Sequence, residues 1–226
     1  GFVKVDNLRS AGIVSRMGAV KKGDKYFLGF PVFRKRGVRK PVTIQRRIDV
    51  KAEYQETMAH YHEYDLWPIM DGFSHFQGLT DECLVAKLSC GSSSMKVWDN
   101  SHHFDRMVDS LPVAYRVLGA VVGVARHVVP MPKVPKKGEV LRVWTVYDVM
   151  TKTGCENEVR GLMAQVNNMA LERGIDYVVV VMDGQEPELA WLKRASIMPL
   201  GYNLFVKEYQ PVPALEGKTY YDVRYL

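Results

Sequence analysis

Long apolar stretches and paired cysteines are missing from this 226-residue sequence. The stretch VLGAVVGVA, residues 117–125, has about half of the ~18 residues that a membrane-spanning helix needs, so we expect no membrane segment. Cys83, Cys90 and Cys155 form neither a paired framework nor the close spacing of a metal site. Free thiols are typical of a reducing compartment, and we expect the protein in the cytoplasm.

Several motifs of enzymes and metal sites are absent as well. The sequence contains neither Gly-x-Ser-x-Gly nor Gly-x-x-x-x-Gly-Lys, and CGSSS at 90–94 lacks the strand-to-helix context of a serine nucleophile. His60, His62 and Asp65, and the pair at 102–103, have no further ligand at a spacing such as His-Glu-x-x-His. We therefore expect no metal site.

Acidic residues are scarce near the beginning of the chain. Residues 1–50 hold 13 Lys or Arg and 3 acidic residues, whereas residues 51–226 hold 18 and 22. The densest basic stretch, FRKRGVRKPVTIQRR at 33–47, is a solvated linker, a binding segment for nucleic-acid phosphates or the contact for an acidic protein partner. Aromatic residues for base stacking are not interleaved with these charges, so we favour the linker and expect no nucleic-acid binding.

The composition that is present describes a globular chain. Of its residues 47% are hydrophobic and 25% are charged, which is typical of one large or two modest domains with a buried core. The four tryptophans are expected to anchor that core. Because the chain opens at Gly1 without a methionine or a signal pattern, we expect a processed or truncated product.

The first 65 residues predict short strands followed by a helix. Two β-rich runs, 1–17 and 25–35, are broken by glycines, and 37–41 is expected to be a linker. VTIQRRI at 42–48 predicts a strand. The helix predicted over 49–65 begins with an aspartate placed to cap it, and its apolar residues fall mostly on one face.

The rest of the chain alternates strands and helices. We expect a hairpin at 82–100 with its turn at Gly91, a helix at 112–128, a strand at 140–150, a helix at 157–174 closed by Gly174, a strand at 177–183, a short helix at 188–195, and closing strands at 202–209 and 220–226. The continuous apolar run of 177–183 predicts cover on both faces of its sheet. The order is β-α-α-β-β-α-β-α-β-α-β.

A group of features in the second half resembles a known family. They are a long helix that ends in Ala-x-x-x-Gly at Ala170 and Gly174, an apolar strand, an acidic turn, a short helix with Ala190, and LGYNLFVKEY at 200–209. This succession resembles the GNAT superfamily of acyl-CoA-dependent N-acyltransferases. The resemblance implies an α/β (α+β) fold with a mixed, mostly antiparallel twisted sheet flanked by helices.

Two further motifs resemble the second lobe of two-lobe members, such as the plant Hookless-type probable N-acetyltransferases and their bacterial relatives. They are IDVKAEYQ at 48–55 and KVWDN at 96–100, and the similarity spans about residues 41–226. Residues 41–226 are therefore expected to be a GNAT-like second lobe.

The first residues fit the same resemblance. Gly1 and Phe2 look like the glycine-aromatic pair that opens the late strands of a GNAT core. Residues 1–40 are thus expected to be the end strands of a preceding lobe plus a basic linker. Their strands should pair in a separate sheet or stay partly unpaired, with the crossing at 37–41.

The family's chemistry implies acetyl-CoA or another acyl-CoA as co-substrate and an amine as acceptor. In the family, the pyrophosphate of the donor lies on backbone N–H groups where the long helix begins. The positions that correspond to the donor site are Tyr147, Val149, Gly154, Asn157 and Arg160.

The loop before the helix departs from the family's pattern. In GCENEV at 154–159, only the first residue is a glycine, and Glu156 and Glu158 would repel a polyanion. Acidic residues also favour the N-terminus of any helix, so an ordinary helix capped near Thr153 or Asn157 is the alternative. We predict weak acetyl-CoA binding by 41–226, and we expect glycine at both glutamate positions to improve binding more than it harms folding.

Catalysis in the family needs a general base, and many members use a tyrosine as general acid. Asp148 is the nearest candidate base, with a polar strand end as the alternative. The position of the tyrosine, four residues after Ala190, is Arg194. Tyr202 is the candidate substitute, unless it only packs in the sheet.

The resemblance therefore implies an N-acyltransferase in which this region is a degenerate second lobe that shapes the acceptor groove. The donor would then be bound by this lobe or by the preceding lobe alone. The alternative is a catalytically silent GNAT-like scaffold or protein-binding subunit.

Overall fold

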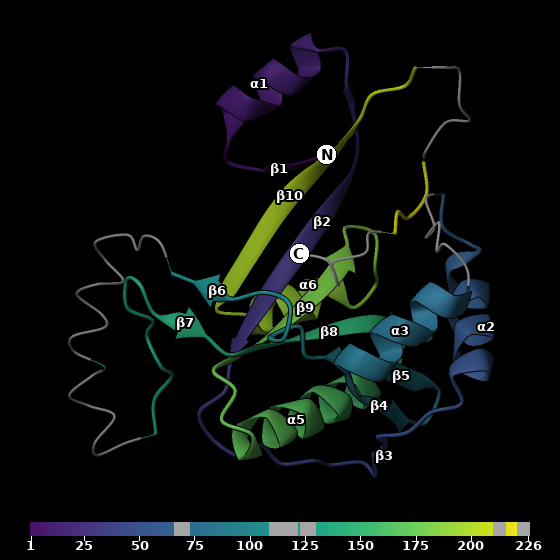
Figure 1. The fold of residues 1–226 in the computed structure, drawn as a ribbon, viewed down its shortest axis with the longest axis vertical. Helices are drawn as coiled ribbons and strands as arrows, with labels where there is room; N and C mark the ends of the chain where they lie inside the picture. The colour runs from purple at the N-terminus through teal and green to yellow at the C-terminus, as the bar shows by residue number, and fades with distance from the viewer. Residues whose placement is uncertain (66–72, 109–121, 123–129, 210–215, 221–226) are drawn as a thin grey trace.

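The computed structural model describes residues 1–65, 73–108, 122, 130–209 and 216–220. These residues form an eight-stranded sheet with the strand order β1-β10-β2-β9-β8-β5-β4-β3, and a small separate sheet of β6 and β7 (Figure 1). The strands are β1 (Phe2–Lys4), β2 (Val20–Pro31), β3 (Thr43–Gln45), β4 (Leu84–Cys90), β5 (Ser93–Trp98), β6 (Arg106–Met107), β7 (Val140–Leu141), β8 (Val143–Met150), β9 (Tyr177–Asp183) and β10 (Met198–Val206). The helices are α1 (Leu8–Arg16), α2 (Val50–Tyr61), α3 (Phe73–Cys83), α5 (Glu156–Glu172) and α6 (Leu189–Ala195).

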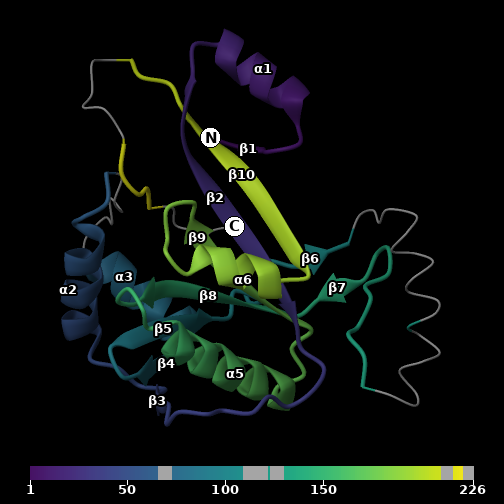
Figure 2. The same ribbon diagram turned by 180° about the vertical axis from the view of Figure 1, so that it is seen from behind.

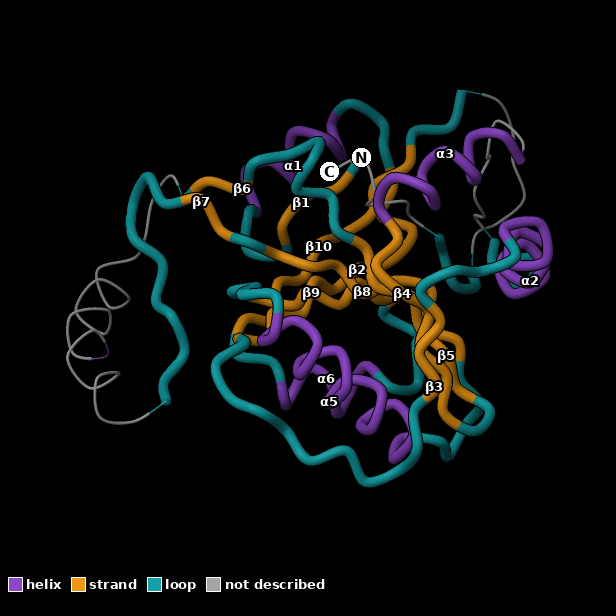
Figure 3. The backbone as a smooth tube through the Cα atoms, turned by 60° about the horizontal axis from the view of Figure 1, so that its bottom comes forward, coloured by secondary structure: helices purple, strands orange, loops and turns teal. Residues whose placement is uncertain are grey.

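Helices cover both faces of the large sheet, as the apolar run of β9 predicts. Figure 3 shows α5 and α6 on one side of the sheet and α3 on the other, and Figure 2 shows α5 and α6 from behind. On the α5 face, Val178 and Val180 of β9 pack with Leu162 of α5 in the main core. On the opposite face, Val181 packs beside Tyr147 in a smaller cluster. The prediction of a mixed, mostly antiparallel sheet flanked by helices is confirmed.

Strands β8 and β9 are the parallel pair within the large sheet, and they pair over only part of their length. Their register runs from Val143 opposite Tyr177 to Val146 opposite Val180. Beyond that point β8 is hydrogen-bonded to β5, and β9 is hydrogen-bonded to β2. Asp148, with a φ of 51°, forms a bulge in β8 where its register with β5 shifts. The parallel pair therefore opens into a notch at the carboxyl ends of its strands.

Several local predictions are confirmed. The carboxylate of Asp49 accepts hydrogen bonds from the amides of Lys51 and Ala52 at 3.0 and 3.1 Å and caps α2. The hairpin of β4 and β5 turns at Gly91, whose φ of 59° suits a glycine. Gly174, with a φ of 64°, follows the end of α5 as predicted.

The β-rich interpretation of residues 1–17 is wrong over most of its length. Only β1 is a strand, and α1 follows it. The helix forms because the side chain of Asn7 accepts a hydrogen bond from the amide of Ser10 at 3.0 Å, and because Ala11 and Val14 pack on a small core at β1 and β10.

Strand β2 corrects the predicted boundary between two sheets. It lies between β9 and β10, with Lys25 opposite Asp183 on one side and Tyr26 opposite Gly201 on the other. Its Leu28 is fully buried in the main core. The strands of residues 1–40 therefore belong to the same sheet as residues 177–183, because their backbone and apolar side chains complete it. That a further lobe precedes Gly1 stays a prediction.

The segment 33–37 is more than a solvated linker, because its backbone is attached to α5. The side-chain amide of Asn168 donates to the carbonyl of Arg36 and accepts from its N–H, at 2.9 and 2.8 Å. Asn167 donates to the carbonyl of Arg34 at 2.9 Å. We call residues 33–37 the basic strap.

The predictions for the tryptophans, the cysteines and the later elements can be compared with the structure only in part, because some of these residues lie outside the described ranges. Trp98, Trp144 and Trp191 are buried, which confirms them as core residues, and the three cysteines are free. The helix predicted at 112–128, apart from Val122, lies outside the described residues, as do Trp67 and the closing strand after Tyr220. Within the part of the chain that the structure describes, no helix has the length and apolar character to cross a bilayer.

Candidate active-site notch and neighbouring cavities

The notch between β8 and β9 contains the predicted base, Asp148. Its carboxylate is 3% exposed and accepts hydrogen bonds from Tyr61 of α2 at 2.6 Å and from Lys96 of β5 at 2.9 Å. Burial, followed by the nearby charge of Asp148, raises the pKa of Tyr61 well above its ordinary value. Tyr61 therefore stays protonated and acts as a donor to the carboxylate at neutral pH.

Lys96 joins Asp148 to a buried chain of charges that reaches α2. Its ammonium lies 2.8 Å from Glu53 and donates to Thr57 at 2.6 Å. Glu53 in turn pairs with Lys87 of β4 at 2.7 Å. Burial alone would lower the pKa of Lys87, but hydrogen bonds to Glu53 and to a second glutamate outweigh it and keep the pKa raised. Removal of any one of these groups would leave a buried partner without its opposite charge.

A second buried ion pair lies on the β9 side of the notch. Lys25 donates to Asp183 at 2.8 Å, and the backbone and hydroxyl of Thr219 donate to the same carboxylate at 3.0 and 2.9 Å. Burial opposes ionisation of Asp183, but the charge of Lys25 and these hydrogen bonds outweigh it and lower the pKa of Asp183. The residues 216–220 are thereby fixed across the opening.

Aromatic side chains fill the remaining space of the notch. The ring of Tyr220 lies 4.3 Å from Tyr61 and 5.8 Å from Tyr147, centroid to centroid, and Tyr64 donates its hydroxyl to Glu186. Val149 also lines this space. The cavity that is left measures about 40 Å³, which is room for a water molecule or two. Small-molecule sites usually measure ~300–1,000 Å³, so the notch does not fit the thioester arm of an acyl-CoA.

The N-terminus of α5, to which the GNAT resemblance assigns the pyrophosphate of the donor, is docked on the turn of the β4–β5 hairpin. Glu158 accepts hydrogen bonds from the amide of Ser92 and the hydroxyl of Ser93, both at 3.0 Å, and pairs with Lys40 at 3.5 Å. Cys155 is the N-cap residue and makes no side-chain cap bond, so neither predicted capping residue has that role. The carboxylate of Glu158 occupies the position between helix and hairpin and would repel a phosphate there.

The other residues predicted for the donor site lie on different surfaces. Gly154, with a φ of 85°, is exposed in the turn before α5, and Asn157 is exposed in the first helical turn. Arg160 turns toward α6, where its guanidinium lies 5.0 Å from the ring of Trp191. The structure thus brings together Tyr147, Asp148 and Val149 at the notch and separates them from Arg160.

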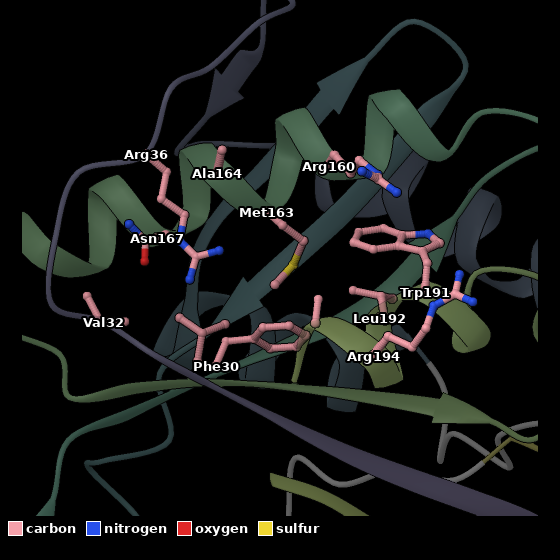
Figure 4. Close-up of a pocket in the computed structure, with 12 residues that line it drawn as sticks. Phe30, Val32, Arg36, Arg160, Met163, Ala164, Asn167, Trp191, Leu192 and Arg194 are labelled. Atoms are coloured by element: carbon pink, nitrogen blue, oxygen red, sulfur yellow. The ribbon is translucent and has the colours of Figure 1, made fainter. Parts of the chain in front are cut away.

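Arg160 lines a second cavity, which we call the interhelix groove. It lies between α5 and α6, measures about 440 Å³ and is shown in Figure 4. Its lining residues are Phe30, Val32, Arg36, Arg160, Met163, Ala164, Asn167, Val178, Trp191, Leu192, Arg194 and Ala195. None of them lines the notch.

Tyr202 lies in a third cavity, on the sheet face opposite the interhelix groove. This cavity measures about 910 Å³ and lies between the sheet and the segment that carries β6 and β7. Tyr202 packs edge-on against Phe27 at 5.2 Å between ring centroids. Val181 lines both this cavity and the notch. The two predicted catalytic residues therefore lie in adjoining spaces rather than in one site.

Sequence reasoning missed the partners of Asp148. Lys96 lies between Met95 and Val97 in β5. Because side chains alternate between the two faces of a strand, a lysine between two apolar residues is expected to face solvent. The available signal was the isolation of this lysine among apolar neighbours. Tyr61 was predicted only as part of the apolar face of α2.

Comparison with solved structures identifies the fold. A crystal structure of the GCN5-related N-acetyltransferase from Sphaerobacter thermophilus matches with a TM-score of 0.55 at 11% identity, over 96% of this chain and 61% of that chain. A functionally unknown conserved protein from Staphylococcus epidermidis ATCC 12228 matches with a TM-score of 0.43 at 12% identity, over 91% of this chain and 69% of that chain. The sequence matches no protein-family profile and no curated protein. The chain spans about three fifths of the Sphaerobacter structure, and it has a GCN5-related N-acetyltransferase fold.

Proposed function

We propose that this chain is a lobe of an acyl-CoA-dependent N-acyltransferase that shapes the binding of the amine acceptor and does not hold the acyl donor. The observation that carries this proposal is the filled notch, with about 40 Å³ of space between β8 and β9. The fold supports the acyltransferase class, and the filled notch supports a degenerate lobe. In this proposal Asp148 keeps the notch closed, and the donor binds to another lobe.

Opening the notch for a donor has an energetic cost. The hydrogen bonds from Tyr61 to Asp148 and from Tyr64 to Glu186 would have to break, and the ring of Tyr220 would have to leave. A hydrogen bond to a charged group contributes ~1.5–3 kcal/mol, so the two together oppose opening by about 3–6 kcal/mol. This cost weakens donor binding by about two to four orders of magnitude.

The acceptor side of the proposal is the cavity that contains Tyr202. Its lining is mostly apolar, it lies on the α3 face of the sheet, and it adjoins the notch at Val181. A cavity of about 910 Å³ has the size of a small-molecule site. The apolar part of the acceptor therefore occupies this cavity, and Tyr202 contacts it.

Calorimetry with acetyl-CoA tests the closed notch. The chain should show no binding at acetyl-CoA concentrations up to about 1 mM, whereas the full-length acyltransferase should bind it about a thousandfold more tightly, in the usual range for enzyme substrates. Micromolar binding by this chain alone would contradict the proposal.

Substitution in the acceptor cavity separates an acceptor-binding lobe from a silent scaffold. Val179→Trp would fill part of the cavity and should raise the KM of the full-length enzyme for its amine, with the KM for acetyl-CoA unchanged. The matched control is Val20→Trp at an exposed position of β2. Equal kinetics for both variants would favour the scaffold.

A further inference from the structure

The interhelix groove has features of a binding site that the proposed function does not use. The sheet separates it from the acceptor cavity, because Val178 faces the groove and Val179 faces the cavity. The groove shares no lining residue with either the notch or that cavity. A ligand bound here would therefore be distinct from both the donor and the acceptor.

Three arginines from three separate segments reach the groove. Arg36 comes from the basic strap, Arg160 from α5 and Arg194 from α6. Figure 4 shows Arg36 at one end of the groove, and Arg160 and Arg194 at the other end beside Trp191. None of the three makes an ion pair with any residue that the structure describes. All three residues are exposed, so each end of the groove offers a solvated guanidinium to an anion.

Arg36 is held in position by the attachment of the strap. Asn168 makes two hydrogen bonds to the backbone of Arg36, and Asn167, which lines the groove, fixes the neighbouring turn of the strap through Arg34. Burial, followed by the charge of Arg34, lowers the pKa of Arg36. The backbone of Arg36 is thus fixed beside the groove, and its exposed side chain reaches the groove from there.

The floor of the groove is apolar. Phe30, Val32, Val178 and Leu192 form it with Trp191, on which the guanidinium of Arg160 lies. Trp191 is 8% exposed, and its indole N–H has no hydrogen-bond partner among the described residues. A free inorganic ion would leave this floor uncovered, whereas a molecule with an apolar body would bury it.

We infer that the interhelix groove binds a small organic anion, with an aromatic or other apolar body against Trp191 and Leu192 and a carboxylate or phosphate paired with Arg36 at the opposite end, while Arg160 and Arg194 add positive charge beside Trp191. The cavity of about 440 Å³ lies within the size range of small-molecule sites. Arginine matches both anions because its planar guanidinium donates two parallel hydrogen bonds to their oxygens. This inference does not rest on the proposed function.

Fluorescence titration of the chain with anilinonaphthalenesulfonate tests the site. Its uncharged counterpart, N-phenylnaphthylamine, should bind at least tenfold more weakly, because it lacks the anion. Arg36→Met should weaken anilinonaphthalenesulfonate binding roughly tenfold or more, the usual effect of removing a charged hydrogen bond. Arg34→Met is the matched control, since this strap residue does not line the groove, and it should change binding less than twofold. Ala164→Trp, which fills the groove, should abolish binding.

Competition identifies the ligand chemistry. Naphthoate and naphthyl phosphate should displace the probe, and the better competitor tells whether the anion is a carboxylate or a phosphate. Inorganic phosphate alone should not displace it. The inference is overturned if the charged and uncharged probes bind equally, if Arg36→Met matches Arg34→Met, if inorganic phosphate competes, or if acetyl-CoA displaces the probe.

Discussion

Removal of Lys96 is the most informative perturbation of the notch. Its ammonium is about 1% exposed and lies within 3 Å of Asp148 at 2.9 Å, Glu53 at 2.8 Å and Thr57 at 2.6 Å. Lys96→Met keeps the length of the side chain and removes the charge. Two buried carboxylates are then left without this partner, and loss of one partner of a buried pair costs about 3–5 kcal/mol.

The effect is measured as the free energy of unfolding in urea at pH 7, followed by tryptophan fluorescence. A loss of about 3–5 kcal/mol corresponds to a fall in Tm of roughly 6–20 °C for a chain of this size. Lys21→Met is the matched control, because Lys21 pairs with Asp24 at the surface, where such a pair contributes ~1 kcal/mol or less. If Lys96→Met unfolds within ~1 kcal/mol of this control, the buried chain of charges does not hold the notch as described.

Three further predictions concern the notch and the contact between α5 and the β4–β5 hairpin. Tyr61→Phe should reduce the free energy of unfolding by about 1–3 kcal/mol, because Asp148 loses a buried donor. Tyr209→Phe, at an exposed position, is the control and should leave it unchanged, so equal urea midpoints for the two variants would contradict this. The pKa of Glu158 is lowered, chiefly by the hydrogen bond from Ser93, so its contribution is present above the usual carboxyl pKa and is lost as pH falls below it. Glu158→Gln should thus destabilise more than Glu156→Gln at pH 7, and the difference should vanish in acid urea titrations. Gly91→Ala should lower the Tm more than Gly138→Ala. Both glycines have a positive φ, but only at Gly91 would the added Cβ overlap Glu158, and calorimetric Tm values that fall equally would contradict this.

Local patterns were sufficient to predict most elements in the described part of the chain. The cap at Asp49, the turn at Gly91 and the end of α5 before Gly174 depend on residues within a few positions of one another. The helix α1 was missed, because a nine-residue helix with two small apolar contacts has a weak sequence pattern, and no range was predicted for α3 or β6. Structure that depends on residues close in the sequence could therefore be predicted from the sequence.

Neighbours across the sheet could not be predicted in the same way. The sequence pattern predicted β2 as a strand, but no residue near it in the sequence indicates that Lys25 pairs with Asp183, 158 residues away. The docking of Glu158 on the hairpin was missed for the same reason, since its partner Ser92 is 66 residues distant. Asp148 was identified as a candidate base. Its hydrogen bond from Tyr61, which helps to close the notch, joins residues 87 positions apart and could not be predicted.

The central position of β2 in the sheet has a consequence for folding during synthesis on the ribosome. Among the described strands β2 is the second to be made, yet Asp183, opposite its Lys25, follows 158 residues later. At about 5–20 residues per second, β2 waits some 8–30 s after synthesis with both edges unpaired. Unpaired edges and apolar residues such as Leu28 and Phe30 can bind other chains during that interval. Translation speed and the supply of chaperones should therefore influence the yield of this protein more than its final stability does.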